Sequence, residues 1–367
     1  DEGWAITCDA SNNLYVTGIT RSMFGIATPT GHQINWGGNQ DAYVAKFDPT
    51  GTTLLYGTYY GGSGDDQGTS IKIDNTGKIF LSGNTTSTNN IASPSAFQST
   101  LGSGDDGMLV GFNATGVRIW GTYFGGDNVD YINDMKLDAN MNLILCGATQ
   151  SSVGISTSGA FQSNIGAINY YDAFLAKCSN SGKIKLATYY GGTDNDRANG
   201  LALDKFGKVY IAGETSSTLS ISTTGSHMSS YAGSGDAFLA KFCMAPEPLV
   251  TPAGTINACN GNSLALVAQT GFPTYLWNTG PVTSTLAVAN ATNGTYYYTV
   301  NVTDGFGCDG TSDSVKVIVA TCTSINEINK NNDLTIYPVP AKDAVFIELN
   351  SLRQGSTPIK FKMYSIN

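Results

Sequence analysis

Residues 57–62 read GTYYGG, and the same phrase returns as GTYFGG at 121–126 and as ATYYGG at 187–192. The copies start 64 and then 66 residues apart. A fixed period of this length marks a repeat architecture, in which each unit folds alike and covers its neighbour. The phrase therefore predicts a packing role before a chemical one.

Two longer segments recur together with this phrase. Residues 41–47 (DAYVAKF) have counterparts that begin at Asp106, Asp172 and Asp236. Residues 66–83 (DQGTSIKIDNTGKIFLSG) have counterparts at 1–18, 130–147 and 196–213. Each complete unit thus holds four short apolar segments joined by turn sequences such as DPTG and DNTG, a pattern typical of two antiparallel hairpins.

Four antiparallel strands per unit, repeated and covered on both faces by neighbouring units, predict the blades of a β-propeller. We expect an incomplete propeller of about four blades in 1–243, followed by two smaller β-domains. Its units lie near 1–40, 41–105, 106–171 and 172–235, with a closing strand at 236–243. The segment 1–40 is half a unit without its own GTYYGG strand, so we expect upstream blades, or at least one strand, to precede it.

The segments DAYVAKFDPTGTTLLYGTYYGG and DNTGKIFLSGNT resemble the SBBP repeats of bacterial surface proteins, which form seven-bladed propellers. The resemblance recurs through residues 1–243 with each copy of the unit. It implies a secreted or cell-surface propeller, but it does not imply one particular activity.

The composition changes near residue 250. Residues 250–321 alternate polar and apolar side chains, and Trp277 together with Tyr296, Tyr298, Val300 and Val302 would fill a β-sandwich core. This segment resembles the PKD-like and immunoglobulin-like modules of secreted Bacteroidetes proteins.

A polar linker at 322–333 precedes the last segment, 334–367. The motif Tyr337-Pro338-Val339-Pro340-Ala341 resembles the start of the C-terminal sorting domain of type IX secretion, except that the family has Asn where Val339 stands. We expect 334–367 to be a truncated sorting domain. The resemblance implies export by the type IX machinery to the outer-membrane cell surface or the medium.

Composition excludes two classes of partner. The net charge of −9 argues against nucleic acid, whose phosphates require a basic protein face. No run of the sequence approaches the roughly 18 apolar residues of a membrane helix, so we expect no membrane insertion.

The cysteines fall into two groups. Cys8, Cys146 and Cys178 occupy positions where other copies carry apolar residues, so we expect them to be buried as small hydrophobic side chains. The remaining four flank or lie in the second domain, which suits disulfides in an oxidising compartment. For these we predict a bond between Cys259 and Cys308, with Cys243 and Cys322 as a possible second pair.

The chain has two histidines, His32 and His227, and both align with Phe97 and Phe161 of the other copies. We interpret them as aromatic substitutes in a loop. A catalytic triad or a zinc centre based on His is therefore not expected.

The repeated aspartates are the main chemical candidates. They form two sets, one at the start of each unit's first strand and one before its third strand: Asp41, Asp106, Asp172 and Asp236; Asp66, Asp130 and Asp196, with Asp1. Copies of one position lie around a propeller axis, so each set could bind Ca²⁺ or flank a glycosidic bond. Catalysis needs one acid and one base in one place, whereas these residues occur in every copy. We therefore favour a scaffold role, in which each Asp accepts backbone N–H bonds at a blade corner.

Three functions stay open. We favour an exported, non-catalytic protein whose long polar loops form a recognition surface for a glycan or a protein. The alternative is a secreted carbohydrate-active enzyme, for which Glu214 is the catalytic candidate because the other copies have no acid at its position. A purely structural stalk or matrix protein is the third possibility.

Overall fold

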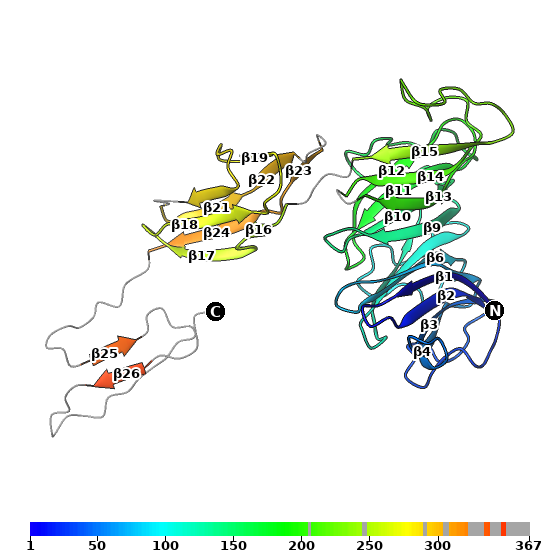
Figure 1. Cartoon of the computed structure of the whole chain (residues 1–367), viewed down its shortest axis with the longest axis horizontal. Coiled ribbons are helices and arrows are strands. Elements are labelled where there is room, and N and C mark those ends of the chain that lie inside the picture. The colour runs from blue at the N-terminus through cyan, green and yellow to red at the C-terminus, as the bar shows by residue number, and fades with distance from the viewer. Residues whose placement is uncertain are drawn as a thin grey trace. The chain divides into compact units, whose positions relative to one another are not determined.

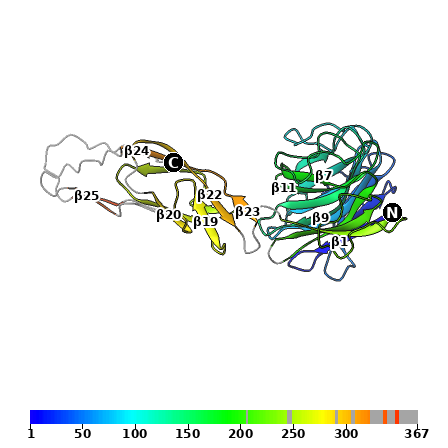
Figure 2. The same ribbon diagram turned by 90° about the horizontal axis from the view of Figure 1, so that it is seen from above.

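A computed structural model describes residues 1–204, 207–243, 248–288, 292–303 and 308–321, and two further strands at 334–337 and 346–349. The chain divides into two compact units, Asp1–Met244 and Ala245–Asn367. All elements in the described residues are strands, and both views show them (Figures 1 and 2). The predicted all-β class is confirmed.

The first unit contains four antiparallel sheets, which follow one another from blue to green in Figure 1. The first sheet has β1 (Glu2–Cys8), β2 (Leu14–Thr20), β3 (Asp41–Phe47) and β4 (Leu54–Tyr60). The second has β5 (Asp66–Ile73), β6 (Ile79–Thr85), β7 (Asp106–Phe112) and β8 (Arg118–Phe124). The third has β9 (Asp130–Leu137), β10 (Leu143–Thr149), β11 (Asp172–Cys178) and β12 (Ile184–Tyr190). The fourth has three strands, β13 (Asp196–Leu203), β14 (Val209–Thr215) and β15 (Asp236–Phe242).

The sheets are out of phase with the sequence units by half a unit. Strands β3 and β4, from the unit at 41–105, pair with β1 and β2, whereas β5 and β6 of the same unit start the next sheet. The half-unit at 1–40 is thus completed within the chain, and the sheet without a GTYYGG strand is the last one. Periodicity in a sequence fixes the length of a repeat but not where each sheet begins, which explains this difference from the expectation.

Consecutive sheets stack through their first strands, because β1 lies beside β5, β5 beside β9 and β9 beside β13. Apolar clusters fill each space between sheets. Val44 of the first sheet, for example, belongs to one cluster with Ile71 and Leu81 of the second. Both faces of the second and third sheets are therefore covered, and β6, β7, β10 and β11 are buried at every position. The arrangement is that of propeller-like blades.

The GTYYGG strand packs as predicted. The rings of Tyr59, Tyr123 and Tyr189 are buried, and each hydroxyl donates to a backbone carbonyl at 2.7–2.9 Å. One detail differs, because a Cβ at Gly57 would lie 2.0 Å from the carbonyl oxygen of Ile26. The close neighbour is the loop after β2, and not the adjoining sheet.

The long loops between the second and third strands run along the outer edge of the fourth strand. The amide of Thr28 donates to the carbonyl of Gly57 at 2.9 Å, and the amide of Tyr59 donates to Gln33 at 3.1 Å. The same two bonds recur in the second and third sheets. These loops satisfy the backbone groups that an open sheet edge would expose.

The hairpin turns also follow the prediction. Asp74 accepts the backbone amides of Thr76 and Lys78 at 2.8 and 2.9 Å through its Oδ1, and Gly77 has a φ of +81°. This is an Asx turn closed by a left-handed residue. The turns that begin at Asp9, Asp138 and Asp204 repeat it.

The second unit has three small three-stranded sheets around one apolar core. They are β16 (Val250–Thr251), β18 (Leu264–Ala268) and β20 (Thr285–Val288); β17 (Thr255–Cys259), β24 (Val315–Ala320) and β21 (Gly294–Tyr298); β19 (Thr274–Trp277), β22 (Val300–Thr303) and β23 (Asp309–Thr311). Trp277 is buried in the core beside Val300 and Val302, and its indole N–H donates to the carbonyl of Thr283 at 2.9 Å. The predicted sandwich core is confirmed.

Strands β25 (Leu334–Tyr337) and β26 (Phe346–Leu349) form an antiparallel pair in the segment expected to be the sorting domain. The linker 322–333, the motif beyond Tyr337 and the rest of 338–367 apart from β26 lie outside the described residues.

Candidate functional site

The corner aspartates lie where strands begin. Asp41 is the first residue of β3, and its Oδ2 accepts the amide of Gly37 at 2.8 Å and the Nε2 group of Gln33 at 2.9 Å. Asp106 and Asp172 begin β7 and β11 and have the same two kinds of partner. All three carboxyl groups are fully buried.

The second set of aspartates is built differently. Asp66 begins β5, and its Oδ2 accepts the amide of Gly62 at 2.8 Å and the hydroxyl of Ser87 at 2.7 Å. The hydroxyl of Thr85 donates to the other oxygen. Asp130 and Asp196 have the equivalent Gly and Ser partners, and both are buried. The predicted acceptance of backbone N–H bonds is confirmed for all six of these aspartates.

The structure brings the two sets together in pairs. A Cβ at Gly61 would lie 2.8 Å from Oδ1 of Asp41 and 2.5 Å from Oδ2 of Asp66, so the two carboxyls flank the Cα of this glycine. Gly125 has the same relation to Asp106 and Asp130, with distances of 2.5 and 2.6 Å. The first glycine of the Gly-Gly pair that ends the GTYYGG phrase is therefore required, because no side chain fits between the acids.

Each pair holds carboxyls that resist ionisation. Burial raises the pKa of Asp41 to about 6, and the neighbouring charge of Asp66 adds to the effect. Burial likewise raises the pKa values of Asp130 and Asp172 to about 7. The Oδ1 atoms of Asp41, Asp106 and Asp172 have no hydrogen-bond donor among the described residues. A proton on one acid of each pair would remove the repulsion between the two carboxylates. It would also supply the hydrogen-bond donor that the Oδ1 atom lacks.

The remaining members of the two sets differ. Asp236 is half-buried, and its Oδ2 accepts the amide of Ala232 at 2.6 Å. Asp1 is exposed and accepts the hydroxyls of Thr20 and Ser22. The fourth copy has Met228 where the others have Gln33, Gln98 and Gln162, so this corner lacks the bridging amide.

Sequence reasoning missed the side chains that complete these corners. Each Gln donates to the first Asp of a pair, and its Oε1 accepts the amide of the glycine between the acids, at 3.1 Å for Gly61. The Ser partners follow a Thr two residues earlier, as in Thr85 and Ser87. The sequence contains signals for both kinds of partner. A Gln precedes three of the repeated Asp residues, and a Thr-x-Ser motif follows each copy of the segment that begins with the second Asp.

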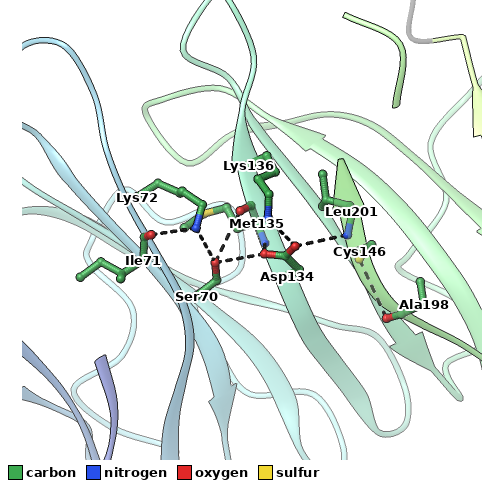
Figure 3. A network of polar contacts seen from close by, with 9 residues as sticks. All are labelled: Ser70, Ile71, Lys72, Asp134, Met135, Lys136, Cys146, Ala198 and Leu201. Carbon is green, nitrogen blue, oxygen red and sulfur yellow. Dashed lines mark hydrogen bonds and ion pairs between the residues drawn. The ribbon is translucent and has the colours of Figure 1, made fainter. Parts of the chain in front are cut away.

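Sequence reasoning also missed Asp134, which the other copies replace by Ala5, Ser70 and Gly200. Figure 3 shows that its carboxylate connects three consecutive first strands. It accepts the hydroxyl of Ser70 of β5 at 3.3 Å and the amide of Leu201 of β13 at 3.2 Å. Lys136 of its own strand pairs with it at 2.5 Å. These three partners give the carboxylate a structural role, as a link between sheets.

Glu214 lies on the open face of the fourth sheet. It lines a hollow of about 450 Å³ together with Asp236 and other residues of β13, β14 and β15. Its carboxylate is exposed and lies 3.9 Å from the Nε of Arg197. Of the described residues, no group of three or more His, Cys, Asp or Glu side chains has the arrangement of a metal site.

The histidine and cysteine predictions have different outcomes. His32 lies against the rings of Tyr60 and Phe112, with ring centroids 6.5 and 5.8 Å away, as an aromatic substitute should. Cys146 and Cys178 are buried free thiols, as predicted. The prediction for Cys8 is wrong, because this free thiol is exposed. It lies on the face of the first sheet that no other described sheet of this unit covers.

Cys243, Cys259 and Cys308 are disulfide-bonded, whereas Cys322 lies outside the described residues. The pairing of Cys259 with Cys308, and of Cys243 with Cys322, stays a prediction.

Comparisons with known proteins identify the repeat. A β-propeller repeat of the SBBP type matches residues 187–219, which run from the third copy of the phrase through β13 and β14. The equivalent segments begin at Gly57 and Gly121. No curated protein matches the chain.

Two solved structures are similar to the chain at a low level. One is the extracellular domain of a one-component system from B. thetaiotaomicron, with 10% identity, a TM-score of 0.20 and coverage of 88% of this chain. The chain covers only 57% of that structure. The other is SGBP-B of the mixed-linkage glucan utilization locus of Bacteroides ovatus, in complex with a heptasaccharide; it has 12% identity, a TM-score of 0.15 and coverage of 64% and 60%. Likenesses at this level do not define a shared fold or function.

In the described residues no helix has the length and hydrophobicity needed to cross a bilayer.

Proposed function

We propose that the chain is an exported cell-surface or secreted protein without catalytic activity. Its propeller-like unit is a scaffold that binds a glycan or a protein ligand. Its C-terminal segment, by resemblance to sorting domains, directs export through the type IX machinery. The buried state of the repeated acids supports the non-catalytic part, because Asp41, Asp106, Asp172 and their partners have no surface that a substrate could reach.

One observation carries the binding role. The loops between the second and third strands carry exposed aromatic side chains, with Phe24 86% and Phe161 71% exposed. Phe161 holds the repeated position of His32, and one side of its ring lies against Tyr190 and Phe242, with ring centroids 6.4 and 5.9 Å away. Tyr170, on the same loop as Phe161, is also exposed. Backbone hydrogen bonds hold these loops along the outer strands, so the scaffold fixes the positions of the rings. Residues on loops that a rigid scaffold positions are a common basis of recognition, and aromatic rings offer a large apolar surface to a ligand.

Affinity electrophoresis of the purified chain in gels that contain soluble polysaccharides tests this proposal. We expect retardation by at least one polysaccharide, and a weaker effect in Phe161→Ala and Tyr170→Ala. Leu55→Ala is the matched control, because Leu55 is exposed on β4 of the first sheet, whereas Phe161 and Tyr170 lie on a loop of the third sheet. If no polysaccharide retards the chain and no protein ligand is captured, the stalk function replaces the binding function.

A carbohydrate-active enzyme is the second candidate, because Glu214 lies in an open hollow beside Asp236. An enzyme would release new reducing ends from a polysaccharide, and Glu214→Gln would abolish this release. Binding without new reducing ends, in both the wild type and Glu214→Gln, supports the scaffold function.

A further inference from the structure

One corner of the first unit departs from the repeat in several side chains at once. These side chains form a row across the second, third and fourth sheets, at the end where the first strands begin. We name Asp105, Tyr131, Tyr171, Arg197 and Glu214 the corner row. The other copies carry different residues at these positions: Glu2 and Gln67 for Tyr131 and Arg197, Gln40 and Gly235 for Asp105 and Tyr171, and Ile19, Asn84 and Ala148 for Glu214. Scaffold residues recur from copy to copy, so a group of departures in one place indicates a role beyond the scaffold.

The side chains of the corner row contact one another in order. The hydroxyl of Tyr131 donates to Oδ2 of Asp105 at 3.0 Å. The rings of Tyr131 and Tyr171 stack, with centroids 6.1 Å apart and an angle of 27° between their planes. The guanidinium carbon of Arg197 lies 3.8 Å from the ring centroid of Tyr171, and its Nε lies 3.9 Å from Oε1 of Glu214. These contacts hold two aromatic rings and a guanidinium in one arrangement.

The link between consecutive sheets does not require these side chains. At each junction the amide of an acid donates to a carbonyl of the preceding sheet's loop: Asp66 to Gln40 at 2.7 Å, Asp130 to Asp105 at 2.7 Å, and Asp196 to Tyr171 at 2.6 Å. The first junction makes this bond with Gln40 and Gln67 at the positions that Tyr171 and Arg197 hold in the third. The stacked rings are therefore additional to the bond that the repeat needs.

The loop that leads into the corner row is longer than its counterparts. In the first and second copies the Gln and the Asp that it binds lie eight positions apart, whereas Gln162 and Asp172 lie ten apart. Ile168 and Tyr170 of this longer loop are 70% and 42% exposed. Asn169 between them has a φ of +72°, and its carbonyl accepts the Nε2 group of Gln150 at 3.4 Å. The insertion thus places one more exposed ring next to Tyr171.

The chemistry of the corner row matches a neutral sugar. Aromatic rings offer an apolar surface to the C–H face of a pyranose, and carboxylates and a guanidinium accept from and donate to its hydroxyls. All five side chains are at least partly exposed, so a ligand can reach them. Two carboxylates and one guanidinium give the row a net negative charge, and the whole chain carries −9, so an acidic glycan would be repelled.

We propose that the corner row, together with Tyr170, is the binding site for a neutral glycan. The tyrosine rings contact the apolar faces of the sugar units, and Asp105, Arg197 and Glu214 bind their hydroxyls. This inference rests on the proposed binding function and names both the class of ligand and the place where it binds.

Affinity electrophoresis of the full chain tests the inference, with β-glucan, xyloglucan and galactomannan as neutral probes and alginate and polygalacturonate as acidic probes. At least one neutral probe should retard the chain, and neither acidic probe should. Tyr171→Ala should weaken the affinity for that neutral probe by about tenfold or more, because aromatic anchors carry much of the energy of a binding site.

Tyr210→Ala is the matched control and should bind like the wild type. Tyr210 also has a cation near its ring, with Nζ of Lys241 5.5 Å from the centroid. Its hydroxyl donates to Asp204, so it lies at the hairpin turn and therefore at the opposite end of the fourth sheet from Arg197. Circular dichroism checks that the variants fold, and Tyr171→Leu, which keeps the bulk without the aromatic ring, replaces Tyr171→Ala if the latter does not.

Each contrary result identifies which claim fails. Equal retardation of the wild type and the Tyr171 variant overturns the site but leaves the proposed binding function, most clearly if Phe161→Ala loses the retardation. Retardation by an acidic probe overturns the ligand class. If no probe retards the wild type, the inference is overturned, and the binding function then depends on the capture of a protein ligand.

Discussion

At the scale of single residues, the corners of the sheets rest on a glycine held between two buried acids. Gly125 lies between Asp106 and Asp130, and a methyl group there would lie 2.5 and 2.6 Å from their oxygens. These oxygens belong to carboxyls fixed by Gln98, Ser151 and backbone amides, so they cannot move aside.

We therefore expect Gly125→Ala to destabilise the first unit by about 3 kcal/mol or more, because it overpacks a buried polar site. Gly200→Ala is the matched control, since a Cβ at Gly200 meets no atom within 4 Å and its φ is not positive. Chemical denaturation followed by circular dichroism measures both. Equal stability of the two variants would refute the role assigned to the glycine.

The acid pairs also predict how stability depends on pH. The folded-state pKa values of about 6 for Asp41 and about 7 for Asp130 and Asp172 lie above the value of about 3.9 for an unfolded Asp. Between these values the folded chain holds protons that the unfolded chain has lost. The free energy of unfolding should therefore decrease as the pH rises from about 4 to about 7.

Thermal unfolding at pH 5 and pH 8 checks this, with a lower Tm expected at pH 8. Asp172→Asn, which mimics the neutral acid, should reduce the difference between the two Tm values, whereas Asp48→Asn on an exposed turn should leave it unchanged. Calcium stays the competing proposal for these acids. A Tm that Ca²⁺ raises at pH 8, and that a chelator lowers again, would favour bound calcium over a shared proton.

At the scale of strands and sheets, burial between neighbours supplies the stability of each element. Leu109 of β7 and Leu239 of β15 occupy the same register position, but only Leu109 is covered by a following sheet.

We expect Leu109→Ala to cost about 2–5 kcal/mol, because it leaves a cavity between two packed sheets. Leu239→Ala should cost well under ~1 kcal/mol in dilute monomer, because exposed substitutions rarely exceed that. Urea denaturation of both variants at low protein concentration makes the comparison. A similar cost for both would mean that the fourth sheet is covered in the same way as the second.

Much of the strand and sheet structure could be predicted from the sequence. Alternating apolar residues and Asp-to-Gly turns specify the strands, and the copies specify which positions are buried. The phase of the sheets could not be predicted, because the same strands in the same order can group in two ways. The pairing of Asp41 with Asp66 also depends on that phase. The role of Asp134 depends on which strands meet across sheets, and the exposure of Cys8 depends on which faces of the first sheet the described sheets cover.

At the scale of the whole molecule, the central claim is that the repeated residues build sheets that shield one another from water. For the first unit, this claim predicts which strands are best protected from water and which are least protected. Those of the second and third sheets have covered faces on both sides, whereas β1 and β15 each border an uncovered face.

Hydrogen–deuterium exchange of the dilute full chain, measured peptide by peptide, tests this most directly. Amides exchange when their segment opens, so the least exposed strands should exchange last. The account predicts the slowest exchange in β6, β7, β10 and β11, and faster exchange in β1 and β15. Uniform protection across all four sheets, or the fastest exchange in the second and third sheets, would contradict it.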